Sequence, residues 1–257
     1  MRNGILVVAL VASVSASVAV GVSAQQGRGA GPAPAAPRPP SPWASAPIDL
    51  TGYWVSIVNE DWRWRMVTPP KGDYASVPLN DAGRKVADGW TTARDGSCEA
   101  YGAAGLMRNP TRVHITWENE NTLKVETDAG VQTRRFFFDP ARKQAPAGPA
   151  TLQGHSYAEW ERPGGGRGAA PPGGNLRVAT TSLRGGWLRK NGVPYSASAT
   201  LTEYYDRFAA PNGDDWLVVT TIVSDPTYLN QDFVTSTHFK KEADGAKWAP
   251  APCKAIT

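Results

Sequence analysis

The sequence predicts an all-β protein that folds as an antiparallel up-and-down β-barrel with one short helix. Runs in which β-branched and aromatic residues alternate with polar ones recur along the chain, turn-forming residues separate many of them, and no helices of crossover length intervene. Alternation with period two is typical of strands whose two faces meet different surroundings. The predicted strands cover residues 52–58, 112–117, 122–127, 131–138, 156–160, 176–183, 199–208, 216–223 and 234–241.

Short turns between these runs indicate that consecutive strands pair as hairpins. The turn chemistry is found at residues 120–121, 128–130, 191–192 and 211–214, where Asn, Asp and Gly are concentrated. Hairpin succession gives up-and-down order, and closing the sheet removes its exposed edges. A closed barrel is therefore favoured, with a β-sandwich as the alternative.

The one predicted helix covers residues 79–90. Its apolar residues have helical spacing, and Asn80 or Asp81 at its start is a candidate N-cap. Strand parity places Val113, Ile115 and Trp117 on one face of their strand. Arg112, His114 and Thr116 share the other face.

The chain divides into a leader, a linker and one domain. Residues 1–24 combine an N-terminal positive charge, an apolar stretch and a small-residue cleavage pattern, which is typical of a secretory signal peptide; a retained membrane anchor is the alternative. Residues 25–47 are rich in Gly, Ala and Pro and are predicted to form a disordered linker. Residues 48–257 form the barrel domain, with a flexible insert at residues 162–174.

Composition excludes several classes of protein. The net charge of +4 is spread along the chain, so nucleic acid is not an expected partner. No long apolar run follows the leader, so no membrane span is expected in the mature chain. An exported protein meets oxidising conditions, so Cys98 and Cys253 are predicted to form a disulfide, with two free thiols as the alternative. No metal-binding spacing is present, and no metal or cofactor is predicted.

The strongest catalytic candidate is Glu203, in the middle of a predicted strand. It shares a face with Tyr205 and Arg207. If this face points inward, Glu203 needs a partner, which Arg134 or Arg207 would supply. A buried carboxylate beside an arginine can act as a general base or bind a polar ligand group. The alternative is a salt bridge that only fills the barrel.

Four further residues are candidates for chemistry or contact. His114 or His238 is an acid–base candidate because imidazole titrates near neutral pH, and His238 is also assigned to ligand contact. Asp225 and Tyr228 follow a strand and would act as catalytic residues if they lie at the barrel mouth. In the alternative interpretation, Asp225 only stabilises a turn by accepting hydrogen bonds from backbone amides.

Ten tryptophans are more than closing one barrel requires. Trp62 and Trp64 alternate with arginines, and in a strand both rings would share one face. With Trp117 and Trp160 they are predicted to contact a flat, partly apolar ligand. Residues 188–195 form a basic turn that would flank the entrance or simply be solvated.

Two resemblances carry further expectations. Residues 49–54 (DLTGYW) open the domain with Gly-x-Trp, which resembles the first strand of lipocalins and other calycins; the resemblance implies that the tryptophan closes the barrel floor beneath a basic residue from a late strand. The order of several short blocks is also similar to that of a group of uncharacterised secreted bacterial proteins, which implies export. These blocks lie at residues 98–110, 132–138, 154–161, 201–208 and 219–233.

These observations lead to one main functional prediction. We expect an exported, periplasmic or extracellular β-barrel that binds a small, partly apolar or aromatic molecule in an aromatic-lined lumen. A cofactor-independent hydrolase, lyase or isomerase that uses the same cavity is the first alternative. A cell-envelope interaction protein with a filled barrel is the second, and an exposed aromatic patch around Trp62 would point to it.

Overall fold

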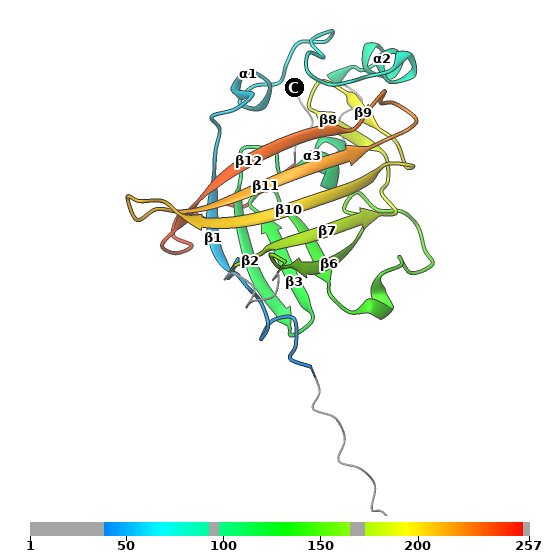
Figure 1. The fold of residues 1–257 in the computed structure, drawn as a ribbon. Helices are drawn as coiled ribbons and strands as arrows, with labels where there is room; N and C mark the ends of the chain where they lie inside the picture. The colour runs from blue at the N-terminus through cyan, green and yellow to red at the C-terminus, as the bar shows by residue number, and fades with distance from the viewer. Residues whose placement is uncertain (1–38, 93–97, 165–172, 254–257) are drawn as a thin grey trace, which may run out of the picture. The chain divides into compact units, whose positions relative to one another are not determined.

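The computed structural model describes residues 39–92, 98–164 and 173–253. Within them, nine strands form a closed β-barrel, which confirms the predicted fold class (Figure 1). The predicted signal peptide, residues 25–38 of the predicted linker and residues 165–172 of the insert lie outside the described residues. The barrel strands are β1 (Gly52–Ile57), β2 (Arg112–Asn119), β3 (Thr122–Thr127), β5 (Gln132–Phe137), β6 (His155–Glu161), β7 (Asn175–Thr181), β10 (Thr200–Ala209), β11 (Asp215–Ser224) and β12 (Phe233–Glu242).

The strands follow one another around the barrel in chain order, with β12 pairing antiparallel to β1 to close it. One neighbouring pair, β5 and β6, is parallel, and the others are antiparallel. A ring of strictly alternating strands needs an even number of members, so nine strands require at least one parallel pair. The predicted antiparallel order is thus interrupted between β5 and β6, where residues 138–154 make the longer crossover that a parallel pair requires.

The shorter elements include more helix than the sequence predicted. The predicted helix is present as α2, and the Asn80 side chain caps it by accepting a hydrogen bond from the Gly83 amide at 2.9 Å. In Figure 1, α1, α2, β8 and β9 gather at one end of the barrel. Among the described residues, no helix is long and apolar enough to cross a membrane. The elements are α1 (Trp62–Arg65), α2 (Asp81–Asp88), α3 (Ala103–Leu106), the 3₁₀ turns η2 (Glu99–Tyr101) and η3 (Pro140–Arg142), and the strands β4 (Ala129–Gly130), β8 (Gly186–Arg189), β9 (Val193–Tyr195) and β13 (Ala251–Pro252).

Apolar and aromatic side chains at alternate strand positions fill the barrel interior, as strand parity predicts. Phe136 and Tyr205 pack edge to face, with ring centroids 5.5 Å apart. Several large side chains of this core are 2 % exposed or less. They are Trp54, Tyr205, Phe136, Phe239, Ile115, Leu123 and Leu176.

Trp54 makes the contact that the lipocalin resemblance implies. Its Nε1 donates a hydrogen bond to the backbone oxygen of Leu50 at 2.9 Å. The ammonium group of Lys241, on the last barrel strand, lies 5.3 Å from the centroid of the Trp54 ring. This cation–π contact joins the first strand to the last.

A second aromatic cluster consists of Trp117, Phe138 and Trp160. Their ring centroids lie between 5.4 and 6.5 Å apart. Trp160 Nε1 donates a hydrogen bond to the backbone oxygen of Pro42 at 2.9 Å. The described end of the predicted linker, residues 39–47, therefore contacts the barrel, because it offers this tryptophan a hydrogen-bond acceptor. Trp117 and Trp160, both predicted as ligand contacts, pack against each other, and Trp160 also bonds to the chain that precedes the barrel.

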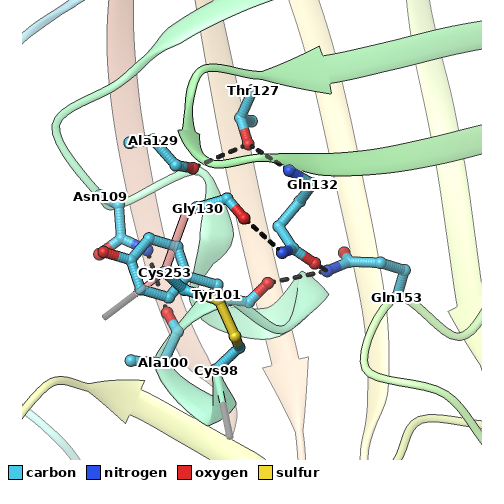
Figure 2. Close-up of a disulfide and its surroundings, with 10 residues drawn as sticks. All are labelled: Cys98, Ala100, Tyr101, Asn109, Thr127, Ala129, Gly130, Gln132, Gln153 and Cys253. Atoms are coloured by element: carbon cyan, nitrogen blue, oxygen red, sulfur yellow. Dashed lines mark hydrogen bonds between the residues drawn. A yellow bond between two sulfur atoms is a disulfide. The ribbon is translucent and has the colours of Figure 1, made fainter. Parts of the chain in front are cut away.

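The predicted disulfide between Cys98 and Cys253 is present, with the two Cα atoms 5.6 Å apart (Figure 2). Cys253 directly follows β13, which pairs with β4, and Cys98 directly precedes η2. The bridge thus joins the C-terminal end of the described chain to the segment that leads into β2. The close-up also shows Asn109, whose side chain donates a hydrogen bond to the backbone oxygen of Ala100 at 3.0 Å.

Candidate anion-binding site

Three nearly buried arginines line a recess beside α1, α3 and β8. Arg65, Arg108 and Arg189 are 4 %, 5 % and 4 % exposed, respectively. The recess has a volume of about 20 Å³, enough for one compact polar group. Trp64, Ala100, Gly105, Asn109, Leu188 and Lys190 complete its lining.

Hydrogen bonds and ion pairs hold some of the guanidinium nitrogens of Arg65 and Arg108. Arg65 Nε donates to the backbone oxygen of Arg108 at 2.8 Å, and its Nη1 pairs with Glu60. Arg108 Nη2 donates to Asp61 Oδ2 at 2.7 Å. Within the described chain, the buried Arg65 Nη2 and Arg108 Nη1 atoms have no hydrogen-bond partner. Both arginines are therefore fixed in place and still keep one donor nitrogen free.

Arg189 differs because none of its guanidinium nitrogens has a hydrogen-bond partner among the described residues. Its Nε, Nη1 and Nη2 atoms are all buried without a hydrogen bond to any described residue. The guanidinium carbon lies 4.7 Å from the centroid of the Trp64 ring, and the guanidinium carbon of Arg63 lies 4.8 Å from it. This cation–π contact orients Arg189 without using its N–H groups. The residue thus presents a positioned and unsatisfied set of donors.

The carboxylates close to the recess form ion pairs with arginines other than Arg189. Glu60 pairs with Arg65, Asp61 with Arg108, and Asp73 with Arg63. An unpaired charge that is removed from water costs several kcal/mol. A bound anion would offset that cost.

The pKa values of Arg189 and Arg65 agree with a positive charge that is buried and poorly compensated. Burial, followed by repulsion from Arg108, lowers the pKa of Arg189 to about 10. Burial also lowers the pKa of Arg65, although the charge of Glu60 opposes the shift. Both directions mean that the surroundings disfavour the positive charge, yet both side chains stay protonated at neutral pH. An anion in the recess would shift these pKa values upward.

Small residues bring the arginines together. All four residues of α3 (Ala-Ala-Gly-Leu) are buried. A Cβ at Gly105 would lie 2.7 Å from the backbone oxygen of Trp187, so only glycine allows α3 to approach β8 this closely. This approach places Arg108, just after α3, beside Arg189 at the end of β8. The buried Asn191 side chain then ties the β8–β9 turn to the backbone oxygens of Pro70 and Asp73, at 3.1 and 3.0 Å.

The structure brings the predicted Glu203, Arg134 and Tyr205 together inside the barrel. Arg134 donates to both carboxylate oxygens of Glu203, at 2.9 and 2.6 Å, and Tyr205 Oη lies 3.3 Å from Glu203 Oε1. Neither side chain of the ion pair has any exposure. Burial alone would lower the pKa of Arg134, but the Glu203 charge holds it above its ordinary value; burial and the same carboxylate raise the pKa of Tyr205. A ligand would reach Glu203 only if this ion pair opened.

Other predicted residues lie outside that cluster. Arg207 donates to the backbone oxygen of Asp49 and to Asp215, each at 2.8 Å, and does not contact Glu203 in the structure. His114 stacks on Tyr53 with ring centroids 4.0 Å apart, and burial lowers its pKa although Glu126 opposes the shift. These three interactions link neighbouring strands or strand ends.

His238 lies closer to the arginine recess. Its Nδ1 is 3.1 Å from Glu60 Oε2, and the other oxygen of Glu60 pairs with Arg65. Both His238 and Glu60 are partly exposed. His238 is therefore linked to the site through one intervening carboxylate.

Asp225 and Tyr228 play different parts. The Asp225 carboxylate accepts hydrogen bonds from the amides of Ser196 and Thr227, at 2.6 and 3.0 Å, as in the turn-stabilising interpretation. Tyr228 lines a second, more open recess of about 320 Å³ beside β8 and β9, together with Trp187 and other residues. Tyr228 is thus the member of this pair that borders a cavity.

The predicted alternation around Trp62 is not a strand. Residues 62–65 form α1, so the two tryptophans diverge: Trp64 lines the recess and Trp62 is 65 % exposed. Met66 and Val67 are also exposed, which gives this end of the barrel an apolar surface patch. The alternating pattern was misleading because four residues of alternating size fit one helical turn as well as a strand.

The arginines of the recess were not among the predicted site residues. Arg65 lies between a tryptophan and a methionine, Arg108 in Met-Arg-Asn-Pro, and Arg189 in the basic turn that was predicted either to flank the entrance or to be solvated. The available signal was an arginine among apolar residues in three separate segments. Nothing in the sequence shows that these segments meet.

Comparisons with known proteins add no assignment: no family model, curated protein or solved structure matches the chain. Among the residues described, no group of three or more His, Cys, Asp and Glu side chains is placed to hold a metal ion. The candidate site therefore rests on its geometry alone.

Proposed function

We propose that the protein is an exported β-barrel that binds a small molecule through an anionic group, held among Arg65, Arg108 and Arg189. The observation that carries the proposal is the buried guanidinium of Arg189, which has three nitrogens without partners in the described chain. Charge-assisted hydrogen bonds to an anion are short and strong in a site that excludes water. Trp64 borders the same recess and orients Arg189 through their cation–π contact.

The proposal places the ligand at the end of the barrel instead of at Glu203. The carboxylate of Glu203 is already bonded to Arg134, and both are fully buried. The arginines of the recess, in contrast, line a cavity and have free donors. The disulfide supports export, because such bonds persist in oxidising compartments. The resemblance to secreted bacterial proteins points in the same direction.

The test is isothermal titration calorimetry, in which inorganic phosphate, sulfate, acetate and benzoate are each titrated into wild type and Arg189→Met. We expect at least one anion to bind wild type, and Arg189→Met to weaken that binding about tenfold or more, because hydrogen bonds to charged groups contribute about 1.5–3 kcal/mol. Arg135→Met is the matched control, since Arg135 is half exposed and pairs with Glu118 on the outside of the barrel. Absence of binding by all four anions would refute the proposal.

A cofactor-independent enzyme is the second candidate, favoured by the contact between His238 and Glu60. A histidine held by a carboxylate can transfer protons, and Glu60 also touches Arg65 of the recess. Hydrolysis of p-nitrophenyl phosphate and p-nitrophenyl acetate by wild type and His238→Asn distinguishes the two functions. Turnover that is lost in His238→Asn while anion binding persists would establish catalysis.

A further inference from the structure

We infer that the anionic group is a tetrahedral oxyanion, a phosphoryl or sulfuryl group, and not a carboxylate. This inference rests on the proposed function and concerns the same recess. Its basis is the number of guanidinium groups that face one small volume, and the number of oxygens needed to satisfy them.

Five buried guanidinium nitrogens lack partners in the described part of the chain. One belongs to Arg65, one to Arg108 and three to Arg189. They come from three separate segments, namely α1, the turn after α3 and the end of β8, and all three arginines line the recess. An anion whose oxygens point in several directions matches donors that approach from several directions.

The same molecule shows what a carboxylate needs. A single guanidinium, that of Arg134, occupies both oxygens of Glu203. On the outer surface, Arg135 likewise bonds both oxygens of Glu118. One arginine is therefore sufficient for a carboxylate in this fold. Three arginines, each with a free donor, indicate a group with a third oxygen.

Charge is consistent with an anionic ligand of either shape. Glu60 and Asp61 compensate Arg65 and Arg108, whereas Arg189 has no ion-pair partner among the described residues. A single negative charge, which either a carboxylate or a sulfate ester carries, would balance Arg189. The number of the free donors and the three segments that supply them, and not the charge, favour a tetrahedral group.

The size of the recess limits what enters it. A volume of about 20 Å³ suits a compact head group and excludes a whole drug-sized molecule, which needs several hundred Å³. The remainder of an esterified ligand would extend out of the recess. A free inorganic ion would fill the same place, so the ester and the free ion have to be distinguished by experiment.

The experiment is isothermal calorimetry of the full mature chain with phenyl phosphate, inorganic phosphate, sulfate, acetate and benzoate at constant ionic strength. We expect at least one tetrahedral anion to bind about tenfold or more tightly than either carboxylate. Tighter binding of phenyl phosphate than of inorganic phosphate identifies an ester as the ligand class, and the reverse order identifies the free ion. Carboxylates that bind as tightly as the tetrahedral anions would overturn the inference and leave the proposed function intact.

A conservative variant tests the role of the donors separately from that of charge. Arg189→Lys keeps the positive charge and loses the planar fork. We expect it to weaken binding of the tetrahedral anion about tenfold, with the circular dichroism spectrum unchanged and Arg135→Lys without effect. Unchanged affinity in Arg189→Lys would show that charge alone attracts the anion, which contradicts the geometric argument. If no anion binds wild type, the proposed function itself fails.

Discussion

At the scale of the residue, the protein contains two kinds of buried arginine. Arg134 forms an ion pair with Glu203 inside the barrel. The sequence predicted a partner for Glu203, Arg134 or Arg207, only on the condition that this face of the strand points inward, and parity did not decide that condition. Arg189 has no such partner in the described chain. Its role could not be predicted, because the residues that surround it are distant in sequence and only the fold brings them together. The first arginine stabilises the fold, and the second is available for a ligand.

This contrast makes a prediction about stability. Arg134→Met leaves the Glu203 carboxylate buried without an ion-pair partner, with only the Tyr205 hydroxyl in hydrogen-bond reach, and we expect the free energy of unfolding to fall by about 3–5 kcal/mol. Arg189→Met removes an unpaired buried charge and keeps much of the packing, so we expect the ligand-free protein to be equally stable or more stable by about 1 kcal/mol. Urea unfolding of both variants in an anion-free buffer provides the measurement. A large loss of stability in Arg189→Met would mean that this guanidinium already has a structural partner.

At the scale of the element, the nine barrel strands were predictable from alternation and turn residues, and each predicted run corresponds to one barrel strand. The helix α2 was predictable too, since helical spacing and a capping asparagine agree. The single turns α1 and α3 were not, because four residues are too few to show a period. These short elements carry or position the recess. The least predictable part of the fold is therefore the part that holds the candidate site.

The β8–β9 turn provides the prediction for this scale. Gly192 and Gly213 both follow an asparagine and have positive φ angles, +78° and +85°. A Cβ at Gly192 would lie 2.2 Å from Trp90, whereas one at Gly213 would have no atom within 4 Å. Gly213→Ala should cost about 1–2 kcal/mol through backbone strain alone, and Gly192→Ala should cost more. Gly192→Ala should also weaken anion binding, because the turn positions Arg189.

Chemical denaturation and anion calorimetry of the two glycine variants check this expectation. Gly213→Ala serves as the control, since its turn joins β10 to β11 and contributes nothing to the lining of the recess. Equal losses of stability in the two variants, with anion affinity unchanged in both, would show that the β8–β9 turn does not hold the site.

At the scale of the whole molecule, the closed barrel and the Cys98–Cys253 disulfide together fix the segments that carry the site. Closure was predictable from hairpin succession. Nine predicted strands in one closed barrel already required a parallel pair, but the sequence did not show that this pair is β5 and β6. The disulfide was predictable from the expectation of export and an even cysteine count. Its structural consequence was not: it anchors the segment of residues 98–111, which contains both η2 and Arg108. The fold's one covalent crosslink is therefore coupled to the recess.

That coupling leads to a prediction for the double variant Cys98→Ser/Cys253→Ser. The bridge joins residues 155 positions apart, and removing it enlarges the conformational freedom of the unfolded chain, so we expect a loss of about 2–4 kcal/mol in the free energy of unfolding. Anion affinity should fall less than in Arg189→Met, because Arg108 keeps Asp61 as a partner and Asn109 keeps its hydrogen bond to Ala100. Urea denaturation and calorimetry measure the two effects, and thiol titration of the denatured, unreduced wild type confirms the starting state. If the double variant lost all anion binding while it stayed folded, the crosslink, and not the local contacts of Arg108, would be what holds the recess together.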